Sequence, residues 1–103
     1  MRDGRHVYVA GTAPVGSESA DAYGQAKHCL AIIVDALREL GAGPEHVVRT
    51  RVYLVDAGDW EAVGRAHGEL FGEHRPASAM LVVAGLLDSA WKVEIEADAL
   101  LPE

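Results

Sequence analysis

The sequence has little cysteine, few aromatic residues and little positive charge. Cys29 is the single cysteine among 103 residues, so no disulfide can form within the chain, and a reducing intracellular setting fits it. Only 6% of the residues are aromatic although 50% are hydrophobic, so the core must be built from Ala, Val, Leu and Ile. With 9 basic and 16 acidic residues the formal net charge is −7, which argues against binding a phosphate backbone.

Long apolar runs and metal-binding patterns are missing too. No apolar run approaches the ~20 residues that span a membrane, and the first residues lack the apolar segment of a signal peptide. We therefore expect a cytoplasmic protein with no membrane partner. The five histidines do not have the spacing of metal ligands. Cys29 lies among apolar residues, which favours a buried small hydrophobe over a nucleophile.

The hydrophobic pattern predicts one domain over residues 1–103, with the order strand, helix, strand, helix, strand, strand. We expect strands at 6–10 and 47–55 and two more within 75–97. The first helix should begin at an N-cap, Ser17 or Ser19, and run to about Leu40, and the second should end at Gly72. Because two helices cover only one face of a sheet, this predicts an α/β fold that oligomerises through its other face.

The most regular stretch is the last strand. Lys92, Glu94, Glu96 and Asp98 alternate with Val93, Ile95, Ala97 and Ala99, so the charged residues share one face and the apolar residues share the other. Two interpretations of the charged face stay open. It is a solvated face, or another subunit covers it and a carboxylate in the resulting cleft positions a water or takes a proton.

The strand at 47–55 has the same kind of alternation. Val48, Thr50, Val52 and Leu54 are expected to face the core, with Arg49 and Arg51 on the opposite side. These arginines could bind an anion, but pairing with Glu94 or Glu96 is the favoured use, because a guanidinium matches a carboxylate with two donors. In the second helix, His67 falls on the apolar side and is expected to bond a neighbour and not to be a ligand.

Four motifs occur in a fixed order: VAGTAP at 9–14, RTRVYLVD at 49–56, HRPAS at 74–78 and VEIEA at 93–97. Together they resemble the RidA (YjgF) family over nearly the whole chain. Older names for such proteins are translation initiation inhibitor and endoribonuclease L-PSP. The resemblance implies a chorismate-mutase-like mixed sheet with two helices on one face. It also implies a homotrimer whose sheets face a central barrel, with a small-molecule cleft at each subunit interface.

The resemblance also implies a chemistry: cofactor-free hydrolysis of reactive imines and enamines to carbonyl compounds and ammonia. Glu94, the first glutamate of VEIE, and the backbone carbonyl of Met80 would hold the attacking water. Gly11 would line the cleft with Ser78 and Ala79. In the family pattern an arginine that grips a substrate carboxylate stands where this chain has Ser78.

Ser78 departs from that pattern, since a hydroxyl offers one neutral hydrogen bond in place of a charged fork. A substrate without the usual carboxylate is therefore expected. The resemblance implies an N-terminal strand that is missing or truncated here, so we expect either that the strand at 6–10 is a bare edge or that the true start lies upstream of Met1. Three functions remain: hydrolysis (deamination) of a small imine, enamine or related carbonyl compound; a non-catalytic trimer that binds a small molecule; and an endoribonuclease, which the acidic charge disfavours.

Overall fold

The computed structural model describes all residues, 1–103. Five strands form one sheet in the order β1-β2-β5-β3-β4. All neighbours in the sheet are antiparallel except β3 and β4, which are parallel. The strands are β1 (Arg2–Asp3), β2 (His6–Thr12), β3 (Val47–Leu54), β4 (Ala77–Val82) and β5 (Val93–Leu100), and the helices are α1 (Ala22–Glu39) and α2 (Trp60–Phe71).

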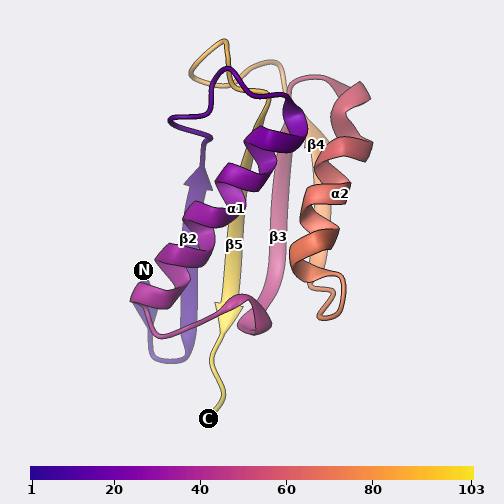
Figure 1. Ribbon diagram of the computed structural model, residues 1–103. Coiled ribbons are helices and arrows are strands. Elements are labelled where there is room, and N and C mark those ends of the chain that lie inside the picture. Colours follow the sequence, from indigo (N-terminus) through magenta and orange to yellow (C-terminus); the bar gives the residue numbers. More distant parts are fainter.

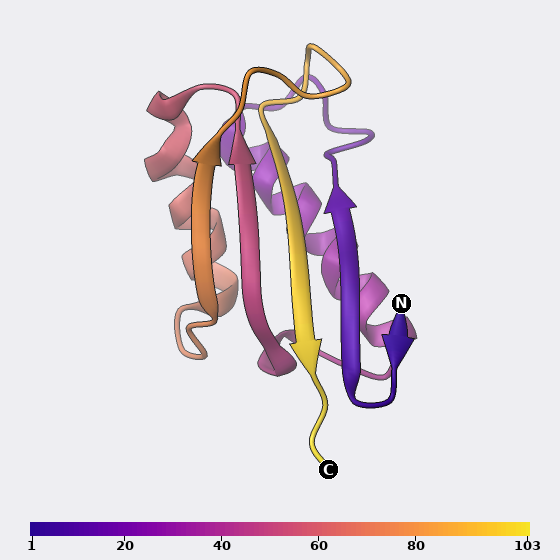
Figure 2. The ribbon, with the colours of Figure 1, turned by 180° about the vertical axis from the view of Figure 1, so that it is seen from behind.

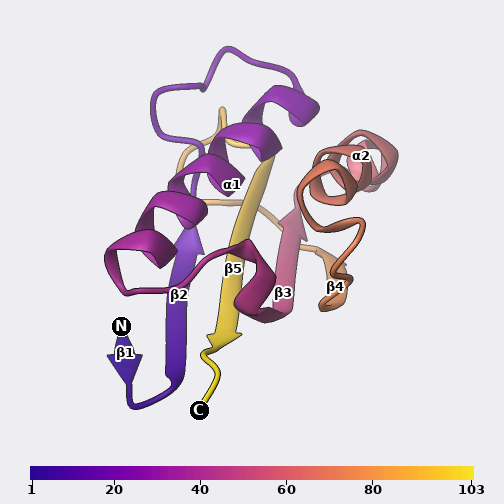
Figure 3. The ribbon, with the colours of Figure 1, turned by 60° about the horizontal axis from the view of Figure 1, so that its bottom comes forward.

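Both helices lie on the same face of the sheet (Figure 1), and the view from behind shows the strands with no helix in front of them (Figure 2). Seen from the bottom, the helices form a separate layer over the sheet (Figure 3). The predicted mixed sheet with two helices on one face is confirmed. Below, the two sides of the sheet are called the helix-covered face and the helix-free face. Neither helix is both long and apolar enough to cross a bilayer.

The core lies between the helices and the sheet. Along β5, Val93, Ile95 and Ala97 are fully buried, as the alternation predicted. They pack with apolar side chains of both helices, including Ala26, Ile33 and Leu37 of α1 and Val63, Ala66 and Phe71 of α2. Small and branched residues fill most of this layer, and Phe71 is the one phenylalanine in it.

The start of α1 corrects the expected caps. Asp21 is the N-cap and accepts a 2.8 Å hydrogen bond from the Gly24 amide, whereas Ser17 and Ser19 precede the helix. The reason is a turn at Ser17, whose carbonyl accepts a bond from the Ala20 amide and delays the helix. The helix ends at Glu39 with Leu40 as its C-cap, which agrees with the expected end at about Leu40, and Gly41 follows with φ +86°, a conformation that suits glycine.

The start of β3 corrects the expected core residues. Val48 is 47% exposed, and Val47 is buried in its place. The pairing with β5 passes from Val47↔Ala99 to Arg49↔Asp98, so Val48 is an extra residue in a β-bulge. Beyond the bulge, Thr50, Val52 and Leu54 are buried as predicted.

The two edges of the sheet differ. The strand at 6–10 is not a bare edge, which was one of the expected alternatives, because the two-residue β1 folds back on β2 with Arg2↔Val7 and Asp3↔His6 paired. The Met1 ammonium also donates a 2.7 Å bond to the Tyr8 carbonyl. The polar sequence of β1 has no alternation, which is why it gave no signal. At the other edge, β4 has one neighbour, and all six of its residues are exposed.

Candidate functional site on the helix-free face and the β4 edge

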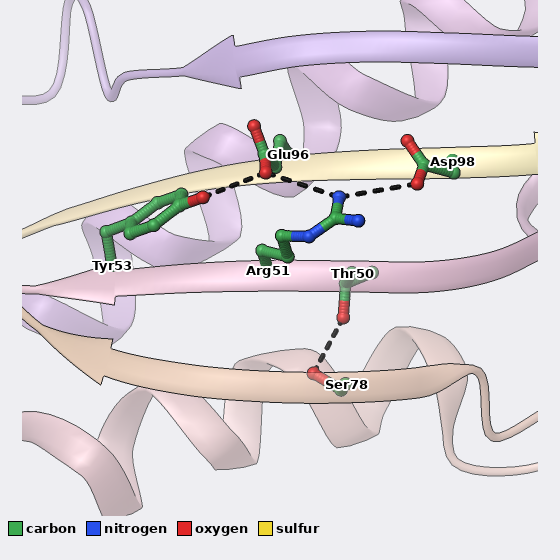
Figure 4. A network of polar contacts seen from close by, with 6 residues as sticks. All are labelled: Thr50, Arg51, Tyr53, Ser78, Glu96 and Asp98. Carbon is green, nitrogen blue, oxygen red and sulfur yellow. Dashed lines mark hydrogen bonds and ion pairs between the residues drawn. The ribbon is translucent and has the colours of Figure 1, made fainter.

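The helix-free face carries a network of polar side chains (Figure 4). The Arg51 guanidinium lies 3.3 Å from both Glu96 Oε1 and Asp98 Oδ2. The Tyr53 hydroxyl donates a 2.8 Å bond to Glu96 Oε1, and this bond raises the pKa of Tyr53. The predicted pairing of Arg51 with Glu96 is therefore confirmed within one chain. Two of the three carboxylates of β5 are occupied by these partners.

Glu94, the third carboxylate of β5, is different. It lies on the same half-exposed face but makes no hydrogen bond or ion pair with any residue of the chain. Its side chain packs against Gly11 of β2, where a Cβ would lie 2.5 Å from Glu94 Oε2. The absence of a side chain at Gly11 thus makes room for a carboxylate that is free to bind something else.

Gly11 sits in a second bulge. Val9 pairs with Ala97 and Thr12 pairs with Ile95, so Ala10 and Gly11 together stand opposite the single residue Glu96. A bulge of this kind interrupts the ladder and leaves backbone polar groups without their usual partners. The bulge brings Gly11, a predicted cleft residue, next to Glu94, a predicted catalytic residue.

The other predicted residues lie on the edge strand. The register pairs Thr50 with Ser78 and Val52 with Met80, so both β4 side chains point to the helix-covered face, and Ala79 points to the helix-free face. The Met80 side chain reaches toward Gly64 of α2. Beyond β4 the Val83 amide donates to the Leu54 carbonyl, and because backbone groups alternate in direction, the Met80 carbonyl points to the open edge.

The five predicted site residues therefore form two groups within one chain. Gly11 and Glu94 lie together on β2 and β5, and Ser78, Ala79 and Met80 lie together on β4, with β3 between the groups. A second copy whose β4 edge meets the first copy's helix-free face could bring the two groups together around one small molecule.

A chain of three polar side chains on the helix-covered side of β4 was missed by sequence reasoning. Thr50 Oγ1 lies 2.7 Å from Ser78 Oγ and 2.8 Å from His67 Nε2. Thr50 is fully buried, and burial of the half-buried His67 ring lowers its pKa. The expectation that His67 bonds a neighbour is confirmed. Thr50 lies 17 residues from His67 and 28 residues from Ser78 in the sequence, so no local pattern indicated these particular contacts.

Cys29 is buried in α1, and burial raises the pKa of its thiol to about 12. A thiol so rarely ionised is a poor nucleophile, which agrees with its predicted structural role. No group of three or more His, Cys, Asp or Glu side chains converges as metal ligands would.

A mixed sheet with two helices on one face, a glycine bulge beside a free carboxylate and an open parallel edge strand define a chorismate-mutase-like α/β protein. The chain belongs to the family described as Endoribonuclease L-PSP, which it matches over residues 1–101. The resemblance to the RidA (YjgF) family is thereby confirmed.

Individual relatives agree with this assignment. The chain is 43% identical to the uncharacterized protein SCO2049 of Streptomyces coelicolor, covering 93% of this chain and 75% of that one. It is 32% identical to a RutC family protein of Haemophilus influenzae, covering 85% and 76%. Among solved structures, Rv2704 of Mycobacterium tuberculosis, a member of the YjgF/YER057c/UK114 family, has a TM-score of 0.91 at 41% identity, covering 97% and 82%. The E. coli TdcF structure, determined with bound serine, has a TM-score of 0.90 at 25% identity, covering 99% and 85%.

Proposed function

We propose that this protein is a homotrimer that hydrolyses a small reactive imine, enamine or related carbonyl compound in clefts between its subunits. Each cleft would combine Gly11 and Glu94 of one copy with Ser78, Ala79 and Met80 of the next. The observation that carries the proposal is the environment of the Glu94 carboxylate. It alone among the β5 carboxylates has no partner in the chain, and it lies against a residue that leaves space beside it.

The chemistry needs only what these residues offer. The Glu94 carboxylate accepts a proton from a water held also by the Met80 carbonyl, and the water oxygen bonds to the imine carbon while the C=N π electrons move to nitrogen. Glu94 returns the proton to that nitrogen. Glu94 then takes the hydroxyl proton of the resulting carbinolamine and passes it to the amine nitrogen, and the C–N bond breaks to release ammonia as the C–O bond becomes a carbonyl. One water is consumed and no electrons are exchanged, so no redox cofactor is required.

Two features of the surface support assembly. The β4 edge exposes apolar side chains, with Met80, Leu81 and Val82 between 39% and 59% exposed. An exposed edge strand of this kind is normally covered in a working protein. The helix-free face also lacks any covering element within the chain (Figure 2).

The second candidate is a trimer that binds a small molecule without converting it. The serine bound in E. coli TdcF supports this alternative, because it is a stable molecule held by a protein of the same fold. An endoribonuclease is the third candidate, and the net charge of −7 argues against it.

Two measurements test the proposal. Light scattering after size exclusion should give three times the 11.0 kDa mass of one chain, and a monomer would leave the two residue groups apart and remove the site. Ammonia release should then be followed with imines generated from several amino acids and amino amides. Release should depend on Glu94, so that Glu94→Ala abolishes it while Glu73→Gln, in the exposed turn after α2, does not. Equal release by Glu94→Ala and the native protein would exclude Glu94, and binding of serine without release from any imine would favour the second candidate.

A further inference from the structure

The chain of hydrogen bonds from His67 through Thr50 to Ser78 has no part in the proposed hydrolysis, yet it ends at the position that replaces the family's arginine. Thr50 Oγ1 is within hydrogen-bond distance of both neighbours, at 2.8 Å from His67 Nε2 and 2.7 Å from Ser78 Oγ. Figure 4 shows the bond between Thr50 and Ser78 crossing from β3 to β4. Thr50 is completely buried, so no water competes for its hydroxyl group.

The single hydroxyl proton of Thr50 gives the series of hydrogen bonds from His67 to Ser78 a direction. A hydroxyl donates one hydrogen bond, so Thr50 can donate to Ser78 or to His67 but not to both. If Thr50 donates to Ser78, His67 must donate from Nε2, and the Ser78 proton is free to point outward. If Ser78 donates to Thr50, His67 accepts at Nε2, and Ser78 offers only lone pairs. The protonated nitrogen of His67 therefore decides what Ser78 presents to a ligand.

Two observations favour the first direction. Nδ1 of His67 has no hydrogen-bond partner in the chain that would hold a proton on that atom. The 2.7 Å contact between the strands is a bond from the Thr50 hydroxyl to Ser78 Oγ, which leaves His67 Nε2 to donate to Thr50. The ring is also half-buried beside Phe71, with centroids 4.8 Å apart, so the uncharged form is favoured.

Ser78 itself has no charged partner in the chain. Its bonded partner Thr50 is neutral, and neither ion pairs nor hydrogen bonds link Ser78 to a cation. Arg75, three residues earlier, directs its Nε to the Gly72 carbonyl. Arg51, which pairs in register with Ala79, is held by Glu96 and Asp98 on the other face of the sheet. Within the proposed cleft, a carboxylate held at Ser78 would exchange part of its hydration for a single neutral donor.

We propose that His67 and Thr50 orient the Ser78 hydroxyl as an outward-pointing donor, which makes Ser78 the group that selects an uncharged acceptor, such as an amide or ketone carbonyl, over a carboxylate. This inference rests on the proposed cleft and specifies its ligand. His67 and Thr50 are positioning residues, because they act through Ser78. Ser78 is the residue that touches the ligand.

The first test determines the direction of the hydrogen bonds between His67, Thr50 and Ser78 without any ligand. Long-range proton–nitrogen NMR spectra of the native protein, recorded above the pKa of the ring, should show the His67 proton on Nε2. In Thr50→Val this proton loses its acceptor and its signal should shift, whereas Thr50→Ser should preserve the native signal. A proton on Nδ1 in the native protein would overturn the proposed direction.

The second test uses two probes of nearly equal size, pyruvamide and pyruvate, titrated against the native protein while the Ser78 backbone amide is monitored. Pyruvamide should bind more tightly, and Ser78→Ala and Thr50→Val should each weaken it by about three- to tenfold, as expected for one neutral hydrogen bond. Thr50→Ser should restore the affinity. Ser19→Ala, an exposed serine before α1, is the matched control and should change nothing.

The outcomes separate this inference from the proposed function. A preference for pyruvate, no binding of either probe, or an unchanged affinity in Thr50→Val would overturn the inference, whatever the ammonia assay gives. Loss of the proposed hydrolysis alone, with pyruvamide still bound through Ser78 and the proton on Nε2, would leave the inference standing and favour the binding trimer.

Discussion

The two faces of the sheet are formed by the same strands, but one face carries the apolar core and the other carries polar, half-exposed side chains. On the helix-covered face, every second residue of β5 is buried and apolar, from Val93 to Ala99. On the helix-free face, Glu94, Glu96 and Asp98 of the same strand stay half exposed, and two of them are satisfied by Arg51. Stability is therefore concentrated on one side of the strand. The other side can carry an unsatisfied carboxylate at little cost, and function is expected there.

The largest difference between the faces should be seen in the chemistry of Cys29, which points into the core. Its pKa of about 12, against an ordinary value of 9.0, makes the thiolate roughly a thousandfold rarer at pH 8. Labelling with iodoacetamide should thus be slower in the folded protein than in urea by at least about that factor. Rapid labelling under native conditions would mean that the helix-covered face opens readily.

Substitutions one residue apart in β5 should then give very different stabilities. Ile95→Ala removes a fully buried side chain from the core and should lower the free energy of unfolding by about 2–5 kcal/mol. Glu94→Ala removes a half-exposed side chain without partners and should change it by less than about 0.5 kcal/mol. Urea denaturation measures both. A large loss for Glu94→Ala would show that its carboxylate supports the fold, and activity data from that variant could not be interpreted.

The Arg51 network should contribute modestly. Arg51→Met leaves Glu96 and Asp98 without their cation, but the side chains of all three residues are 27% to 39% exposed, so the loss should be about 0.2–1 kcal/mol. The loss should shrink in high salt. Lys27→Met, which breaks the more exposed pair with Glu69, is the comparison and should cost less. This range applies to an open helix-free face, so a cost well above 1 kcal/mol at low salt would indicate that another copy covers this face in solution, as the proposed trimer requires.

The comparison also explains what the sequence could predict. The alternation from Lys92 to Ala99 identified both faces of β5 correctly, because a period of two is a local property of the chain. The bulges at Val48 and at Ala10–Gly11 could not be foreseen, since they depend on how β5 pairs with its neighbours. Likewise, the contact of Ser78 with Thr50 joins strands separated by a helix, and no pattern within either strand indicates it. Family motifs supplied Gly11 and Glu94 as candidates, but only the structure shows that they touch.

Gly11→Ala should have the smallest effect on stability and is the sharpest probe of the helix-free face. The new methyl group would lie 2.5 Å from Glu94 Oε2, and because this atom ends a flexible side chain, the carboxylate can rotate away. Gly11 is not among the glycines with positive φ, so alanine fits the backbone. The free energy of unfolding should therefore change by less than about 0.5 kcal/mol.

Ammonia release should respond to Gly11→Ala much more strongly than stability does. If the carboxylate must lie beside Gly11 to hold the water, Gly11→Ala should reduce ammonia release nearly as much as Glu94→Ala, with the fold intact. Gly68→Ala, in the exposed part of α2 where a methyl group meets nothing within 4 Å, is the matched control and should raise stability by up to about 1 kcal/mol without affecting release. If Gly11→Ala released ammonia at the native rate, the proposed role of Glu94 would not depend on its position beside Gly11. The space beside Gly11 would then be a consequence of the bulge and not part of a site.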